Sequence, residues 1–221
     1  MNVLELFSGT HSIGKVFESN GYNIISVDLD NKFNPTHNID ILEFDYKQYP
    51  QDYFTYIHSS PPCILFSQNQ QTWYGREKKH NITGEMVIWD RKQHEECIKL
   101  SDMLVEKTLE IINYFKPKYF TIENPHHNNW NNIKYRPYML EIPYSLVDYC
   151  MYDFPAKKPT IVFNNFNLVL KTCDKSHTHI KFSNFNIKNG ENKLYTRYVI
   201  PKNLCEEIFN QIYFLENQIV C

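Results

Sequence analysis

The chain has 221 residues, a net charge of -2 and 42% hydrophobic residues, which suit one globular domain that builds a core without disulfides. The near-neutral charge gives no overall electrostatic sign of nucleic-acid binding, so any phosphate contacts must come from local groups of Lys and Arg. The six cysteines include no CxxC pair, and neither a secretory signal nor a long apolar run is present. These features exclude a disulfide scaffold and a membrane-spanning protein and favour an intracellular location.

The first part of the chain alternates between strand and helix patterns. Residues 2–7 predict a buried strand, residues 11–21 a short helix that ends at Gly21, and residues 22–30 a second strand that ends in acidic residues. Asp40 lies near the end of a third predicted strand. This alternation predicts a parallel sheet with helices on both faces.

Two further strands are predicted on either side of a long helix. Residues 54–60 form the first, which ends at two prolines, and residues 118–125 form the second. The helix is expected from Glu95 to Phe115. Residues 66–90 are polar and lack periodicity, so we expect a mobile loop there, and residues 200–217 predict a closing amphipathic helix.

The segment LELFSGTHSIG (4–14) predicts a nucleoside site. A strand leads into a turn of small residues and then a helix, which places a ligand beyond the carboxyl ends of the strands. Gly9 allows close approach of the backbone, and Asp28 can accept hydrogen bonds from two ribose hydroxyls. The GxGxxG pattern and a P-loop lysine are absent, which argues against a dehydrogenase. A turn without any ligand is the alternative, and His11 reads as a surface or capping residue.

The segment HSSPPC (58–63) predicts a nucleophile. Pro61 and Pro62 force an extended turn after a strand, and this turn presents Cys63 at the edge of the sheet. A thiolate is a strong nucleophile. Glu123, in TIENP (121–125), ends the next strand at the same edge, where a carboxyl can hydrogen-bond a nucleobase. We interpret four of the other cysteines as small buried apolar side chains: Cys97, Cys150, Cys205 and Cys221.

LELFSGT (4–10), PPC (61–63) and ENP (123–125) occur in this order and together resemble the motifs of the C5-cytosine DNA methyltransferase family. The likeness is to the short forms found in phages and large DNA viruses, and it covers residues 2–165 and resumes near 197. It implies an α/β fold with the Rossmann-like, seven-stranded, mainly parallel sheet of class I methyltransferases. It also implies a single catalytic domain over residues 1–221, in which residues 165–196 form a minimal recognition region.

The resemblance implies S-adenosyl-L-methionine as the cofactor and double-stranded DNA as the partner. Cys63 would add to carbon 6 of a flipped cytosine, and Glu123 would contact N3 and the exocyclic amine of that base. Ser67, Lys158 and Thr160 would lie against the substrate. A viral protein of this kind would act in the host cytoplasm or nucleus. The residues expected to hold the cofactor are Phe7, Ser8, Gly9, Thr10, Asp28, Asp40 and Pro62.

Two family features are missing. The family usually has a glutamine and two arginines where this chain has Ala156, Lys158 and Thr160, and the Gly-Asn pair of its last motif is absent from residues 197–209. Residues 165–196 are too few for a normal target-recognition domain. Two alternatives therefore remain: cytosine-5 methylation of tRNA or another RNA, and a degenerate, inactive subunit that binds nucleic acid. The target sequence and the oligomeric state stay open.

The segment CDKSHTH (173–179) carries three residue types that bind zinc, Cys173, His177 and His179. No fourth ligand is evident nearby in the sequence. A solvated loop is therefore the favoured interpretation, and no metal is expected.

Overall fold

Seven strands form one mixed sheet in the computed structural model, which describes residues 1–80, 83–180 and 198–217. Their order is β3-β2-β1-β4-β7-β9-β8. The first five pair in parallel, whereas β9 is antiparallel to both of its neighbours. This confirms the mainly parallel sheet expected from the sequence. The strands are β1 (Asn2–Leu6), β2 (Asn23–Asp28), β3 (His37–Asn38), β4 (Tyr56–Ser59), β7 (Tyr119–Pro125), β8 (Tyr144–Asp148) and β9 (Pro159–Asn164).

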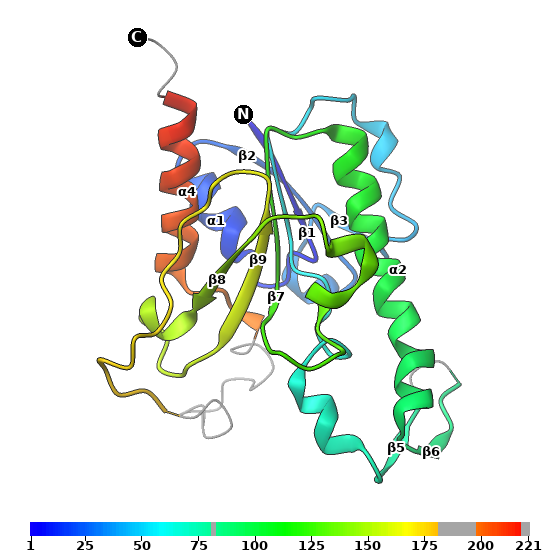
Figure 1. Cartoon of the computed structure of the whole chain (residues 1–221). Coiled ribbons are helices and arrows are strands. Elements are labelled where there is room, and N and C mark those ends of the chain that lie inside the picture. The colour runs from blue at the N-terminus through cyan, green and yellow to red at the C-terminus, as the bar shows by residue number, and fades with distance from the viewer. Residues whose placement is uncertain (81–82, 181–197, 218–221) are drawn as a thin grey trace.

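Helices cover both faces of this sheet (Figure 1). The helices α1 (Ser12–Ser19) and α4 (Lys202–Asn217) pack together on one face, and α2 (Arg91–Phe115) covers the other. Each helix turns an apolar side toward the sheet, as its sequence period predicts. Within the described residues, no helix combines the length and the apolar character that crossing a bilayer requires.

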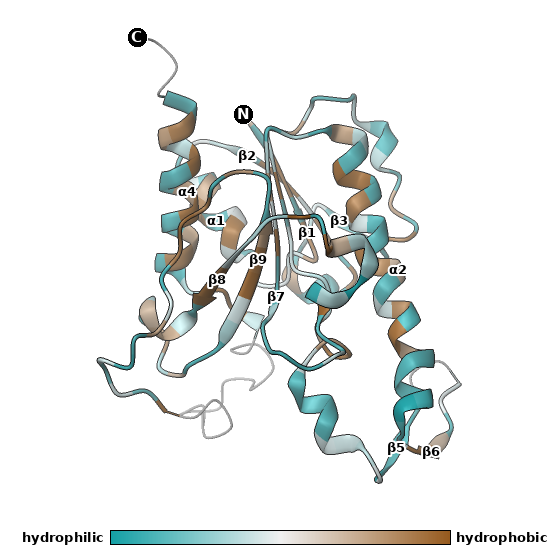
Figure 2. Ribbon diagram, viewed as in Figure 1, coloured by the Kyte–Doolittle hydropathy of each residue, from teal (hydrophilic) through white to brown (hydrophobic). Residues whose placement is uncertain are grey.

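The sheet separates two apolar clusters, which appear as brown bands along its strands (Figure 2). Alternate residues of a strand point to opposite faces, so β1 sends Val3 to one cluster and Leu4 to the other. On the α1 side, the Phe17 ring stacks on Tyr56 of β4 with their centroids 4.9 Å apart. Packing from both sides therefore fixes the central strands that carry the candidate site.

The helix α2 begins four residues before the predicted Glu95, at Arg91. The side chain of Asp90 accepts a hydrogen bond from the Gln93 backbone N–H at 2.9 Å and so caps the first turn. This capping position was overlooked because the apolar period of the helix becomes clear only after Glu95. The helix ends as predicted at Phe115, and Lys116 adopts a left-handed conformation.

The expectation of a mobile loop over residues 66–90 is wrong for the part that the structure describes. A 3-10 helix covers Gln68–Trp73, and the strands β5 (Glu77–Lys79) and β6 (Met86–Ile88) form an antiparallel hairpin. Trp89 is fully buried and packs on Trp73 with their ring centroids 5.2 Å apart. Isolated aromatic anchors hold this segment, and a search for sequence periodicity does not detect such anchors.

Candidate active site

The strand register brings three predicted site segments to one edge of the sheet. Leu6 of β1 pairs with Ser59 of β4, and Ser59 pairs with Ile122 of β7. After Leu6 the chain enters the turn at residues 7–11, and after Ser59 it leads into the loop at residues 61–67. Glu123 directly follows Ile122. All three lie at the carboxyl ends of the parallel strands, the lower edge of the sheet in Figure 1. Ligands of open α/β sheets bind at this edge.

The turn at residues 7–11, here called the cofactor turn, has an unusual backbone. Phe7, Gly9 and His11 all have positive φ angles, of 53°, 43° and 54°. The Gly9 N–H donates a hydrogen bond of 2.7 Å to Oδ2 of Asp28, and Oδ1 of Asp28 accepts one of 2.8 Å from the Asp30 backbone. Asp28, predicted as a ribose ligand, therefore also holds the turn itself.

A buried glutamate that the sequence analysis did not single out supports this turn from below. Glu5 of β1 is 2% exposed, and its Oε1 accepts a hydrogen bond of 3.1 Å from the Ile13 N–H in α1. A Cβ on Gly14 would lie 2.5 Å from Oε2 of Glu5, so the glycine makes room for the carboxylate. Glu5 also raises the pKa of His11, whose Nδ1 lies 3.6 Å away. The sequence did offer a signal for this residue, because Glu5 is an acidic residue within an otherwise apolar strand.

The remaining predicted cofactor residues are spread around the same edge. Thr10 is buried, and its hydroxyl lies 2.7 Å from that of Ser12. Asp40 lies two residues beyond β3, where its Oδ1 accepts a hydrogen bond of 2.9 Å from the Leu42 N–H. Pro62 is exposed. The structure thus keeps these residues at the carboxyl side of the strands, and Asp40 and Thr10 are partly engaged in local hydrogen bonds.

The loop at residues 61–67, here called the nucleophile loop, is held through its backbone carbonyls. Asn124, in β7, donates from Nδ2 to the Pro61 carbonyl at 3.0 Å, and Asn131 donates to the Leu65 carbonyl at 3.1 Å. His127 Nε2 lies 2.6 Å from the Phe66 carbonyl. Asn124 of the ENP segment, together with His127 and Asn131 beyond β7, therefore holds the loop that carries Cys63.

Cys63 is half-buried, and the groups around it set its ionisation. Burial raises the pKa of the Cys63 thiol above its ordinary value, and the negative charge of Glu123 adds to the rise. The positive charge of Lys158 acts in the opposite direction and lowers the pKa. These electrostatic effects tie Cys63 to the two predicted partners, Glu123 and Lys158, in one site.

Glu123 is 8% exposed and is oriented by two groups from the β8–β9 region. The Tyr149 hydroxyl donates a hydrogen bond of 2.8 Å to Oε1 of Glu123, and Lys158 Nζ lies 3.7 Å from the same oxygen. Lys158 Nζ also lies 4.5 Å from the centre of the Tyr149 ring. Tyr149 was missed in the sequence because no pattern links it to a residue in β7.

The three substrate residues predicted from the sequence have different surroundings. Lys158 reaches Glu123, as described above, whereas Thr160 is fully buried and its hydroxyl donates to the Lys158 carbonyl at 3.3 Å. Ser67 caps the 3-10 helix at Gln68–Trp73 through a hydrogen bond of 3.2 Å from Asn69 N–H to its Oγ. Ala156 is also fully buried. Of the three, Lys158 therefore brings a charge to Glu123, whereas the Thr160 hydroxyl is used in a local bond to the backbone.

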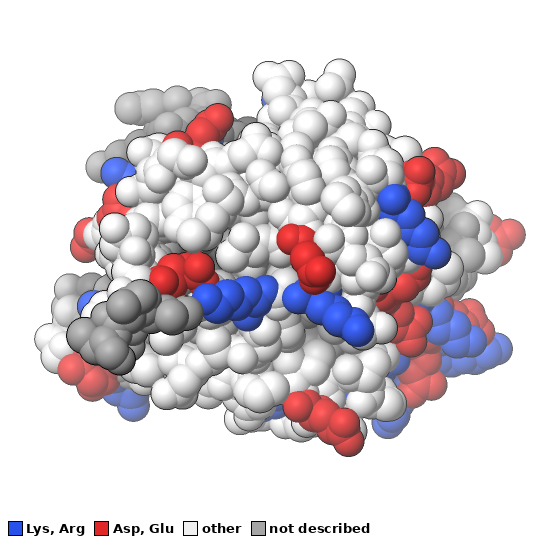
Figure 3. Space-filling view, turned by 90° about the horizontal axis from the view of Figure 1, so that it is seen from above, with Lys and Arg blue, Asp and Glu red and all other residues white. Residues whose placement is uncertain are grey.

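The sequence has three small groups of basic residues, at residues 76–79, 91–92 and 157–158, and those of the last two groups are paired with acids. Arg91 lies 2.8 Å from Glu95, and Lys157 lies 3.5 Å from Asp148. The face opposite the candidate site mixes basic and acidic side chains on a largely uncharged surface (Figure 3). Neither observation marks an extended basic surface away from the site. Of the minimal recognition region, residues 181–196 lie outside the described part of the chain.

The chain is similar to a protein of Frog virus 3 (isolate Goorha) described as a probable DNA (cytosine-5)-methyltransferase. The two are 34% identical over 177 residues, which cover 78% of this chain and 75% of the viral protein. No protein-family model matches the chain.

Two solved structures also resemble the chain. One is described as a putative DNA modification methyltransferase encoded within a prophage (E. coli), with 16% identity and a TM-score of 0.45 over 74% of this chain. The other is the Entamoeba histolytica methyltransferase EhMeth, with 15% identity and a TM-score of 0.49 over 76% of this chain. The matches cover 46% and 54% of those two proteins, so the chain spans about half the length of each.

Proposed function

The chain belongs to the DNA (cytosine-5)-methyltransferase family, and we propose that it transfers a methyl group from S-adenosylmethionine to carbon 5 of cytosine in DNA through a covalent Cys63 adduct. The observation that carries this proposal is the pairing of Cys63 with Glu123. Both residues lie at the carboxyl edge of the sheet, as the cofactor turn does, and the charge of Glu123 raises the pKa of the Cys63 thiol.

The cofactor turn fits a nucleoside ligand. Ser8 Oγ is buried without a hydrogen-bond partner among the described residues, so a polar ligand can satisfy it. Each oxygen of Asp28 accepts one backbone N–H and keeps a second lone pair, which can accept a ribose hydroxyl. When bound, S-adenosylmethionine supplies an electrophilic methyl group. Phe7 and Gly9 of the turn and Asp28 at the end of β2 would hold it.

Cys63 performs the first covalent step. Its Sγ, as the thiolate, forms a bond to carbon 6 of a cytosine that has left the base stack, which costs a few kcal/mol of lost stacking. Electron density then increases at carbon 5, which would take the methyl group as its bond to the sulfonium sulfur breaks and S-adenosylhomocysteine is left. Loss of the proton from carbon 5 and cleavage of the S–C6 bond restore the aromatic base and the free thiolate.

Glu123 supports the charge that forms in the base during this attack. Its carboxyl contacts N3 and the exocyclic amine of cytosine, so that N3 can be protonated while Sγ adds to carbon 6. Tyr149 and Lys158 hold Oε1 of Glu123 in place, which limits the orientations of the carboxyl group. Lys158 also favours the Cys63 thiolate through its positive charge.

Transfer of a labelled methyl group tests the proposal. The protein is incubated with labelled S-adenosylmethionine and a panel of duplex DNA sequences or tRNA, and bisulfite sequencing of the DNA locates the modified base. We expect label in DNA at cytosine carbon 5. Label in tRNA alone would contradict the proposed substrate but keep the chemistry. A folded protein that labels neither would support the degenerate-subunit alternative and reject the proposed activity.

A further inference from the structure

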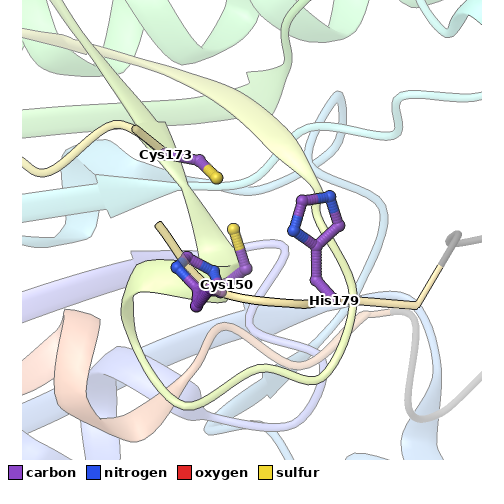
Figure 4. Close-up of side chains that lie close together, drawn as sticks. Cys150, Cys173 and His179 are labelled. Atoms are coloured by element: carbon purple, nitrogen blue, oxygen red, sulfur yellow. The ribbon is translucent and has the colours of Figure 1, made fainter. Parts of the chain in front are cut away.

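A cluster of four metal-binding side chains lies outside the proposed catalytic residues. Cys150, Cys173, His177 and His179 each offer one ligand atom, and these atoms all lie within 4.8 Å of one another. Figure 4 shows the sulfur atoms of Cys150 and Cys173 and the ring of His179 directed into one shared space. We propose that these four residues bind a structural Zn²⁺ ion. This proposal goes beyond the methyltransferase activity and does not depend on it.

The ligand set and its spacing suit zinc. Two thiolates and two imidazoles form the Cys₂His₂ set of structural zinc sites, and two thiolates neutralise the charge of the ion. Bonds of about 2.3 Å to sulfur and about 2.0 Å to nitrogen give tetrahedral edges of roughly 3.3–3.8 Å. The longest separation in the cluster is therefore about 1 Å too wide, which small rotations of side chains in a loop can close.

The fold brings the four ligands together from two segments. Cys150 lies in the 3-10 helix Tyr149–Met151, directly after β8. The second segment returns alongside it, because the Lys171 carbonyl accepts a hydrogen bond of 3.1 Å from Asp148 N–H, and Cys173 N–H donates one of 2.8 Å to Oδ2 of Asp148. After the histidines, Ile180 N–H donates to the Pro155 carbonyl at 3.0 Å. Backbone bonds at both ends of the segment thus hold the cluster in place.

The state of the histidines also points to a ligand. His177 Nε2 is buried and has no hydrogen-bond partner among the described residues. A buried imidazole nitrogen without a partner is costly, and coordination of a metal ion removes this cost. The rings of His177 and His179 lie 5.7 Å apart, so both can face one ion.

The site has four protein ligands and therefore no open position for a reacting water molecule, which makes its role structural. It connects residues 173–179 to the turn that contains Tyr149, whose hydroxyl binds Glu123. A bound ion would thus stabilise the segment that follows β9 against the rim of the active site. The sequence analysis expected no metal because it did not connect Cys150 to the CDKSHTH segment.

Metal content tests the proposal. The reduced full chain is purified with zinc, dialysed, and analysed by elemental mass spectrometry, and Co²⁺ is then exchanged for Zn²⁺ to record its visible absorption spectrum. We expect one zinc per chain and an intense tetrahedral cobalt spectrum with thiolate charge-transfer bands. We also expect chelation to lower the Tm. A folded, reduced wild-type chain that binds neither metal would overturn the proposal, as would a disulfide between Cys150 and Cys173 without metal.

Variants locate the site and separate binding from folding. Cys150→Ser and His177→Ala should lose the zinc, whereas Thr178→Ala, between the two histidines, should keep it. Cys63→Ser should also keep it, because that thiol belongs to the proposed active site. His179→Cys should retain the metal and change the cobalt spectrum toward three thiolates, which a general folding defect would not produce. Retention of one zinc by folded Cys150→Ser and His177→Ala chains would overturn the assignment.

Discussion

The cofactor turn and the nucleophile loop lie at the same edge of the sheet, yet they are held in different ways. The cofactor turn depends on residues close to it in the chain or on the neighbouring strand, chiefly Glu5 and Asp28. The nucleophile loop depends on side chains far along the sequence, such as Asn131. A site assembled from remote segments can therefore fail through residues that no local motif reveals.

We expect the largest loss of activity when the carboxyl group of Glu123, next to the nucleophile loop, is replaced. Glu123→Gln keeps the shape of the side chain but removes the charge that supports protonation at N3. We expect the rate of methyl transfer to fall by about 10²–10⁴-fold, the range of acid–base groups. Single-turnover kinetics measure this, with Glu106→Gln at an exposed position of α2 as the control. An undiminished rate in Glu123→Gln would mean that the second catalytic residue lies elsewhere.

A change at the cofactor turn should weaken the binding of S-adenosylmethionine more than it slows methyl transfer. Asp28→Ala removes the acceptors for the ribose and for the Gly9 N–H, so S-adenosylmethionine should bind about 1–3 kcal/mol more weakly. Calorimetry checks this, and Asp30→Ala, a half-buried neighbour whose side chain pairs with Lys32, should leave the affinity near that of the wild type. Equal affinities for wild type and Asp28→Ala would reject the ribose assignment.

Tyr149, which is distant in the chain from Glu123 but binds it, should have a smaller effect on the rate when it is changed to Phe. This change removes one hydrogen bond to Glu123, worth about 1 kcal/mol, and the rate should fall roughly fivefold. Tyr152→Phe is a matched control, because the Tyr152 hydroxyl accepts the Lys171 N–H and makes no hydrogen bond to Glu123 within the described part of the chain. If both variants lose the same amount of activity at equal folded fraction, the specific role of Tyr149 is refuted.

The smallest expected effect is a shift in the pH profile of the reactivity of Cys63. Because the folded chain raises the pKa of this thiol, its reaction with iodoacetamide should accelerate as pH rises past the ordinary range of a cysteine. Lys158→Met removes a charge that lowers the pKa, so this profile should shift to higher pH. Lys157→Met serves as the control, since Lys157 pairs with Asp148. A profile that stays in place in Lys158→Met would show that Lys158 does not act on the thiolate.

The sequence predicted the parts of the molecule that short segments encode. The strands around residues 2–7, 54–60 and 118–125 follow from apolar runs ended by prolines or small turns, and their parallel order brought Cys63 and Glu123 to one edge. The start of α2 and the hairpin after residue 66 were missed, because a single capping residue and a few buried aromatics decide them.

The supporting residues of the site could not be predicted for a different reason. Tyr149 and Asn131 act through contacts between segments that are distant in the chain, and nothing in their local sequence marks them. Cys150 is the same case: it looked like a small apolar residue until the fold placed it beside Cys173. Local patterns indicate which side chains can react, but the tertiary fold determines which side chains surround them.

Trapping of Cys63 on DNA that contains 5-fluorocytosine tests the central claim most directly. Fluorine cannot leave carbon 5 as a proton does, so after methyl transfer from S-adenosylmethionine the elimination that frees Cys63 is blocked and the reaction should stop at the methylated covalent adduct. The account predicts a DNA–protein complex that survives denaturation, with the base attached to the Cys63 peptide, and no complex in a folded Cys63→Ser chain that still binds the cofactor. An adduct that persists in Cys63→Ser, or attachment at another residue of the wild type, would contradict the role of Cys63.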